Sequence, residues 1–174
     1  MPVSKKRGLR VNSGHKGQLM NDSSAPDNTA IQRASGATYA GDVDVIMAWE
    51  AVKSVPNSVL VDVRTAAEWN FVGVPDLSSI EKQPVLVEWQ VFPTMDVNGA
   101  FVDSVAEATP DKSAPIYFLC RSGARSKSAA IAMTQVGYEE CFNIIPGFEG
   151  PHDTDQHRGL TDGWKARGLP WVQG

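Results

Sequence analysis

The fold is decided by residues 115–126, which read PIYFLCRSGARS. Their first part, residues 115–119, is a short apolar run with β-branched and aromatic side chains, which is typical of a buried strand. The pattern then becomes helical up to Gly137, a residue suited to a left-handed helix end. The sequence therefore predicts a strand, a tight loop that starts at Cys120, and a helix over residues 125–136.

Strands and helices alternate on both sides of this segment. Asp44 has the side chain of an N-cap and precedes apolar residues at helical spacing, while Thr65 and Glu68 have the spacing of a capping box. The other predicted elements are strands over residues 58–63, 84–89 and 141–145 and a helix over residues 101–108. This alternation predicts an α/β domain with a mainly parallel central sheet flanked by helices.

Three loops are expected to meet at one edge of that sheet, because ligands bind beyond the carboxyl ends of parallel strands. They are residues 62–65, 120–126 and 146–150. Asp62 and Arg64 lie in the first loop and face the cysteine loop. We expect them to pair with each other or to bind loop amides, and so to support the site from outside.

Cys120 has the surroundings of a nucleophile. Free amides at a helix N-terminus, together with the helix dipole, favour a thiolate, and Arg121 and Arg125 add positive charge. Gly123 permits the backbone angles of a loop that bends around a central sulfur. The same amides can hold the outer sulfur of a persulfide. A lone buried cysteine is usually a small hydrophobe, but these neighbours favour catalysis.

At these residues the sequence resembles a known family. Residues 119–126 (LCRSGARS) look like the active-site loop of single-domain rhodaneses, and residues 61–64 (VDVR) with Glu68-Trp69 look like their second signature. Gly147, Gly163-Trp164 and residues 168–170 match the usual ending, so the resemblance covers roughly residues 38–172.

The resemblance implies a sulfurtransferase. Cys120 would take sulfane sulfur from a donor such as thiosulfate and pass it to cyanide or a thiol, with a protein thiol as a possible acceptor. It implies no cofactor and no metal. Arg121 and Arg125 would help to bind the anionic donor, and the substrate-binding loop would consist of Arg121, Ser122, Gly123, Ala124, Arg125 and Ser126.

The chain also departs from the family pattern. Family members usually carry Gly-His-Ile-x-Gly-Ala after the second helix, whereas residues 72–77 read VGVPDL without a histidine. Residues 88–93 (EWQVFP) replace a simpler segment, and residues 151–162 are additional. We expect residues 151–162 to border the pocket mouth and to help select the acceptor, with a solvated surface loop as the alternative.

Two other functions compete with sulfur transfer. A phosphatase or arsenate reductase needs five residues between its cysteine and arginine, but four separate Cys120 from Arg125, and Ser126 and Leu119 stand where such enzymes carry arginine and histidine. The smaller ring suits a sulfur atom better than a phosphate. The second alternative is a non-enzymatic rhodanese-type binding or regulatory module, which usually lacks the cysteine.

Cys141 opens its strand whereas Cys120 follows the end of its own, so adjacent parallel strands would separate them by ~15 Å. A disulfide cannot span that distance, and we expect Cys141 to lie in the core. The spacing of His152, Asp153, Asp155 and His157 matches no strong metal motif and is typical of a polar loop.

Composition limits the partners. The net charge is -4, and five cations (Lys5, Lys6, Arg7, Arg10 and Lys16) precede the first acidic residue, Asp22. The acidic remainder argues against nucleic-acid and membrane binding. Polar residues 1–37 are expected to be a disordered tail and residues 38–174 a rhodanese-like domain. Two cysteines and the lack of a long apolar run favour the cytoplasm.

Overall fold

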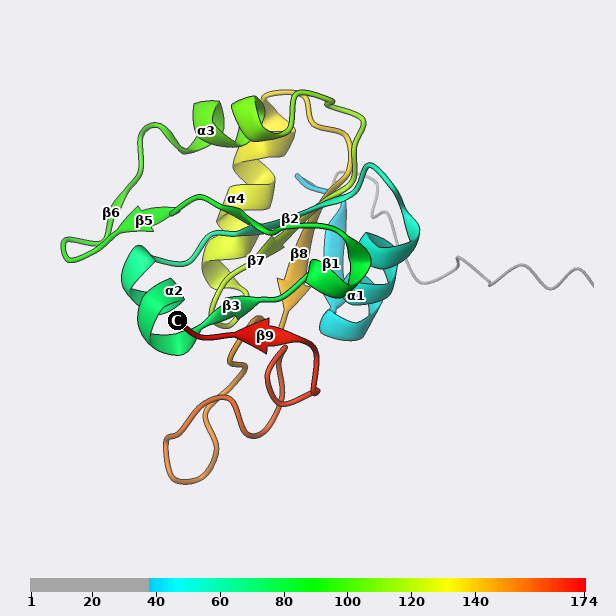
Figure 1. Cartoon of the computed structure of the whole chain (residues 1–174). Coiled ribbons are helices and arrows are strands. Elements are labelled where there is room, and N and C mark those ends of the chain that lie inside the picture. The colour runs from blue at the N-terminus through cyan, green and yellow to red at the C-terminus, as the bar shows by residue number, and fades with distance from the viewer. Residues whose placement is uncertain (1–37) are drawn as a thin grey trace, which may run out of the picture. The chain divides into compact units, whose positions relative to one another are not determined.

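The computed structural model describes residues 38–174, and its centre is a five-stranded parallel sheet (Figure 1). The strand order is β1-β8-β7-β2-β4, and every neighbouring pair is parallel. The strands are β1 (Gly41–Asp44), β2 (Val59–Asp62), β4 (Val85–Leu86), β7 (Ile116–Leu119) and β8 (Cys141–Ile145). The predicted α/β fold with a parallel central sheet is therefore confirmed. The expected tail over residues 1–37 lies outside the described residues.

Residues 38–174 form four α-helices, the first two of which begin at a side-chain cap that the sequence predicts. They are α1 (Val45–Ser54), α2 (Ala66–Val72), α3 (Phe101–Ala108) and α4 (Ala124–Gln135), with a short 3-10 helix, η1 (Ser78–Ile80). The Asp44 side chain accepts a hydrogen bond from the Ile46 amide at 2.8 Å. The predicted capping box is present, since Thr65 accepts from the Glu68 amide and Glu68 accepts from the Thr65 amide.

The sheet is buried on both faces, and β7 shows this by strict alternation. Tyr117 and Leu119 belong to the core that α1 covers, whereas Ile116 and Phe118 belong to the core beneath α3 and α4. Successive side chains of a strand point to opposite faces. Cys120 continues this alternation and lies in the core on the α4 face.

The predicted strand over residues 84–89 is shorter than expected, because only Val85–Leu86 form the strand β4. Val85–Leu86 pair with β2, and the Val87 and Trp89 amides still donate to the carbonyls of Asp62 and Val63, at 3.2 and 3.1 Å. The Glu88 side chain turns to accept a hydrogen bond from the Ala66 amide at the start of α2, at 2.7 Å. The chain then forms a short antiparallel hairpin of β5 (Gln90–Val91) and β6 (Asp96–Val97).

Three further strands were not predicted from the sequence. β1 directly precedes α1, and β3 (Val74–Pro75) pairs with β9 (Trp171–Val172) in an antiparallel ladder. This small ladder fixes the chain end against the segment that follows α2. Within residues 38–174 no helix has both the length and the apolar character needed to cross a bilayer.

Candidate active site

The three predicted loops meet at the carboxyl ends of β2, β7 and β8, as expected. The Val63 amide donates to the Leu119 carbonyl at 2.8 Å, which joins the first loop to the end of β7. On the other side, the Phe148 amide donates to the Cys120 carbonyl at 2.8 Å. A Cβ on Gly147 would lie 2.6 Å from that same carbonyl oxygen, so only glycine lets the two loops approach so closely. The cysteine loop is thus held from both neighbouring strands.

The loop bends around the sulfur of Cys120, a residue only 1% exposed. Its Sγ accepts hydrogen bonds from the Gly123 amide and the Ser126 hydroxyl, both at 3.1 Å. Gly123 is the N-cap of α4 and has a φ of 108°, in the region that favours glycine, as the sequence predicts. Two hydrogen-bond donors therefore face the position where negative charge on sulfur would develop.

A chain of buried hydrogen bonds extends behind the sulfur. The Ser126 hydroxyl also lies 2.6 Å from the Asn143 amide oxygen, and the Asn143 amide nitrogen donates to Asp42 at 2.8 Å. Because a hydroxyl has one hydrogen, Ser126 shares it between Cys120 and Asn143. The sequence did not predict a role for Asn143 or Asp42. The available signal was Asn143 itself, a polar residue in the middle of the otherwise apolar strand β8.

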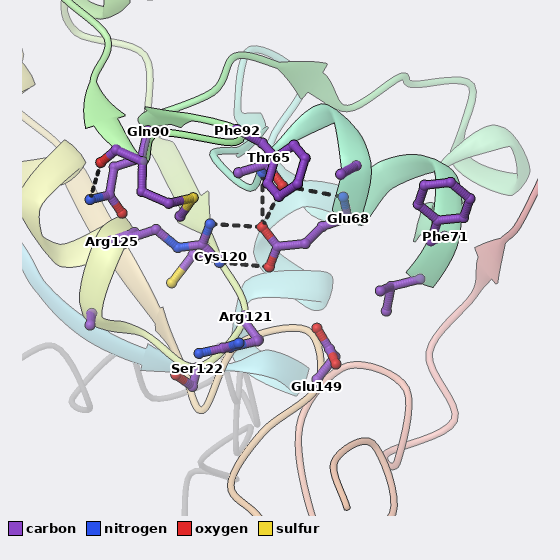
Figure 2. Close-up of a pocket in the computed structure, with 14 residues that line it drawn as sticks. Thr65, Glu68, Phe71, Gln90, Phe92, Cys120, Arg121, Ser122, Arg125 and Glu149 are labelled. Atoms are coloured by element: carbon purple, nitrogen blue, oxygen red, sulfur yellow. Dashed lines mark hydrogen bonds and ion pairs between the residues drawn. The ribbon is translucent and has the colours of Figure 1, made fainter.

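In front of the sulfur lies a pocket of about 590 Å³ (Figure 2). It is lined by the cysteine loop and the start of α4, by α2 and its cap, by the β5–β6 hairpin, and by the loop after β8. The lining residues are Thr65, Ala67, Glu68, Phe71, Val72, Gln90, Phe92, Met95, Cys120, Arg121, Ser122, Ala124, Arg125 and Glu149. Of the loop residues predicted to bind substrate, Gly123 and Ser126 lie buried behind this surface.

The expected place of residues 151–162 is wrong. Among residues 38–174, the pocket lining includes none of them, and the β5–β6 hairpin stands at the mouth instead. The additional segment forms its own turn, in which the Asp153 amide donates to the His157 carbonyl at 2.8 Å. Further along, the Gly159 amide donates a hydrogen bond to the Glu149 carbonyl at 2.7 Å. The segment thus forms a surface loop that is hydrogen-bonded to the backbone of Glu149 and contributes no side chain to the pocket lining.

Arg125 is tied to Glu68 across the pocket wall (Figure 2). Its two terminal nitrogens each donate to one Glu68 carboxylate oxygen at 2.7 Å. Burial acts to raise the pKa of Glu68, but hydrogen bonds from Arg125 and Thr65 and the charge of Arg125 lower it to about 2. Glu68 was predicted only as a capping residue, and the structure gives it this additional partner. The charge of Arg125 is therefore largely neutralised before any substrate arrives.

Arg121 and Glu149 form the other charged part of the pocket. Arg121 is exposed, and no ion pair ties its guanidinium to another residue among residues 38–174. The Glu149 Oε1 atom is buried and has no hydrogen-bond partner within the same part of the chain. Figure 2 shows both side chains on the same side of the pocket, beneath the Glu68–Arg125 pair.

Asp62 and Arg64 pair with each other, as predicted, and lie outside the pocket lining. Both side chains are 0% exposed and their closest charged atoms are 2.5 Å apart. Arg64 also donates to the Gly73 carbonyl at 2.7 Å and lies 3.9 Å above the centre of the Phe148 ring. The pair thus joins the loop after β2 to the end of α2 and to the loop after β8.

Cys141 lies in the core, as predicted, and both cysteines are free and buried. Burial raises the pKa of the Cys141 thiol to about 11, although a hydrogen bond with Thr134 acts in the opposite direction. This thiol is therefore protonated near neutral pH. Among the residues that the structure describes, no group of three histidine, cysteine, aspartate or glutamate side chains could hold a metal ion.

Fold and site together define a single α/β domain with a cysteine loop between a parallel strand and a helix. Comparison with known proteins identifies the group. The family model of the rhodanese-like domain matches residues 47–153. The chain belongs to the rhodanese-like domain family. This is a sulfurtransferase-type family.

Three known proteins illustrate the relationship. The crystal structure of Rv0390 from M. tuberculosis is similar with a TM-score of 0.72 at 46% identity, covering 78% of this chain and 99% of that one. An uncharacterized protein of Rickettsia conorii is 42% identical over 71% of this chain and 90% of its own. Thiosulfate sulfurtransferase GlpE of Actinobacillus succinogenes is 26% identical over 71% of this chain and 82% of its own length.

Proposed function

We propose that this protein transfers sulfane sulfur through a persulfide on Cys120. The observation that carries the proposal is the position of the Cys120 sulfur, which faces the Gly123 amide and the Ser126 hydroxyl at the base of an open pocket. Donors so placed stabilise a thiolate and, after loading, a persulfide. The likeness to GlpE, named a thiosulfate sulfurtransferase, supports the same chemistry.

The reaction has two steps. In the first, the Cys120 thiolate attacks the outer sulfur of thiosulfate, the sulfur–sulfur bond of the donor breaks, and sulfite leaves with the electron pair. A persulfide remains on Cys120. In the second, an acceptor such as cyanide or a thiolate attacks the outer sulfur, and Cys120 departs as a thiolate. Each step exchanges one bond to sulfur for another and needs no external oxidant.

The two loop arginines have different roles in this proposal. Arg121 is exposed at the pocket and free to meet an anionic donor. Arg125 donates to Glu68 with both terminal nitrogens, so its role is to fix α2 against the cysteine loop. Ser122 and Ala124 line the pocket, while Gly123 and Ser126 hold the sulfur.

Mass spectrometry tests the proposal. Incubation of the full chain with thiosulfate should add one sulfur, about 32 Da, that peptide mapping places on Cys120. Cys120→Ser should lose the gain and the thiosulfate-to-cyanide activity, since serine forms no anion near neutral pH. Cys141→Ala is the matched control because its thiol is buried in the core, and it should load normally.

Two outcomes would overturn the proposal. One is activity of Cys120→Ser above a few per cent of the unaltered protein. The other is failure of the unaltered chain to take up sulfur from either thiosulfate or inorganic polysulfide, which would favour the non-enzymatic binding module.

A further inference from the structure

The mouth of the pocket presents apolar side chains to solvent. Phe71 on α2 is 79% exposed, and Phe92 and Met95 of the hairpin are 60% and 39% exposed. Figure 2 shows the two phenylalanine rings on either side of Glu68. Large apolar groups exposed on the lining of the pocket that holds the nucleophile indicate a site that binds apolar surface.

The size of the pocket also indicates a ligand larger than a small inorganic ion. A volume of about 590 Å³ is that of a site for an organic molecule, whereas cyanide and thiosulfate have only a few heavy atoms. Either small ion would leave the phenylalanine rings without a partner. The apolar rim therefore contributes to binding only when the molecule that carries or receives sulfur has a larger body.

Once Cys120 carries sulfur, the charges in the pocket disfavour an anionic acceptor. Glu68 and Arg125 neutralise each other in two hydrogen bonds, and the formal charges of Arg121 and Glu149 cancel. A persulfide anion on Cys120 would then give the loaded pocket a net negative charge. The buried Glu149 Oε1, which has no partner within residues 38–174, can accept a hydrogen bond but repels a carboxylate.

We infer that the sulfur acceptor is an uncharged organic thiol with an apolar body. The rim of Phe71, Phe92 and Met95 binds that body, and an N–H or O–H group of the acceptor donates a hydrogen bond to Glu149. This inference rests on the proposed function. The acceptor thiolate attacks the outer persulfide sulfur, a new sulfur–sulfur bond forms, and the Cys120–sulfur bond breaks. Its electron pair returns to Cys120, and the acceptor leaves with the outer sulfur as a persulfide anion, its thiol proton having passed to water before the attack.

Single-turnover discharge of the loaded protein tests the rim. Cys120 is loaded, the load is verified by mass, and discharge is timed with benzyl mercaptan and with cyanide. In the double variant Phe71→Ala/Phe92→Ala, the rate ratio of benzyl mercaptan to cyanide should fall about tenfold. Leu160→Ala is the matched control, because Leu160 is 72% exposed but lies outside the pocket lining, and it should keep the ratio.

A second comparison tests the charge. Glu149→Gln should raise the rate with mercaptoacetate relative to 2-mercaptoethanol about three- to tenfold, because the repelling carboxylate is gone. Glu107→Gln removes an exposed carboxylate of α3 outside the lining and should leave that ratio unchanged. Since each variant is compared with the unaltered protein, the different nucleophilicities of the thiols cancel.

Three results would overturn the inference. They are an unchanged benzyl mercaptan ratio in the double variant, an unchanged mercaptoacetate ratio in Glu149→Gln, and a double variant in which the rate ratio of a cysteinyl peptide to cyanide falls further than that of benzyl mercaptan. The last result would assign the rim to a protein acceptor. Failure of loading itself contradicts the proposed function, and the initial mass measurement distinguishes that case.

Discussion

Two arginine–carboxylate pairs lie near the cysteine loop, and they differ in their surroundings. Asp62 and Arg64 are 0% exposed and outside the pocket lining, whereas Glu68 and Arg125 are 18% and 15% exposed and line the pocket. The first pair closes a loop and contacts Gly73 and Phe148. The second joins α2 to α4 and sets the charge of the pocket. The same chemical pair thus supports the fold in one place and shapes the substrate site in the other.

The largest expected effect comes from breaking the fully buried pair. Arg64→Ala leaves the Asp62 carboxylate buried without its partner and removes the contact with Phe148. The free energy of unfolding should fall by about 3–5 kcal/mol, a large part of the stability of a domain this size. Urea denaturation measures the change. A loss below 1 kcal/mol would show that water enters the site and that the pair is not isolated.

A smaller effect is expected from the pocket pair. Glu68→Gln removes the charge but keeps the shape, and it should lower the free energy of unfolding at pH 7 by about 1–3 kcal/mol. Burial acts to raise the pKa of Glu68, yet its hydrogen bonds lower it from 4.5 to about 2. The folded state therefore binds the proton more weakly than the unfolded chain, and the stabilisation is present above pH 4.5 and is lost as the pH falls towards 2.

Urea denaturation at several pH values checks this dependence. The difference between the unaltered chain and Glu68→Gln should be constant from pH 7 to about 5 and should narrow at lower pH. A difference that widens on acidification would contradict the assigned direction of the shift. If Arg125 anchors α2, Glu68→Gln should also slow the loading of sulfur onto Cys120. Loading at the rate of the unaltered protein would mean that the Glu68–Arg125 pair contributes to stability but not to sulfur transfer.

An exposed ion pair provides the reference for the stability changes expected of Arg64→Ala and Glu68→Gln. Lys53 and Glu50 lie 3.9 Å apart on α1 with exposed fractions of 54% and 60%. Water and salt screen such a pair, so Lys53→Ala should leave the urea midpoint unchanged within error. A clear loss here would mean that truncation of a long side chain, and not loss of an ion pair, accounts for part of the other effects.

Local signals explain which parts of the molecule were predictable. Residues 141–145 form β8 with the predicted bounds, and the Thr65–Glu68 box and the Asp44 cap form as their spacing requires. Each of these features depends on neighbours a few positions away. The same holds for the cysteine loop, where Gly123 adopts the expected positive φ.

The features that were missed depend on contacts between distant residues. Glu68 meets Arg125 across 57 positions, and Asn143 meets Asp42 across 101. The β5–β6 hairpin is short and exposed, so neither alternation nor burial marks it in the sequence. Residues 151–162 were misplaced because the direction of a loop depends on its closing bonds, here from Gly159 to Glu149.

The alternation along β7 has a consequence for how this site tolerates change. Ile116, Phe118 and Cys120 lie on one face because they are two positions apart, and the strand continues directly into the nucleophile. Exchange of one apolar side chain for another of similar size keeps this spacing. Insertion or deletion of a single residue between Ile116 and Leu119 instead turns Cys120 towards α1, so the length of the strand is constrained more tightly than its composition.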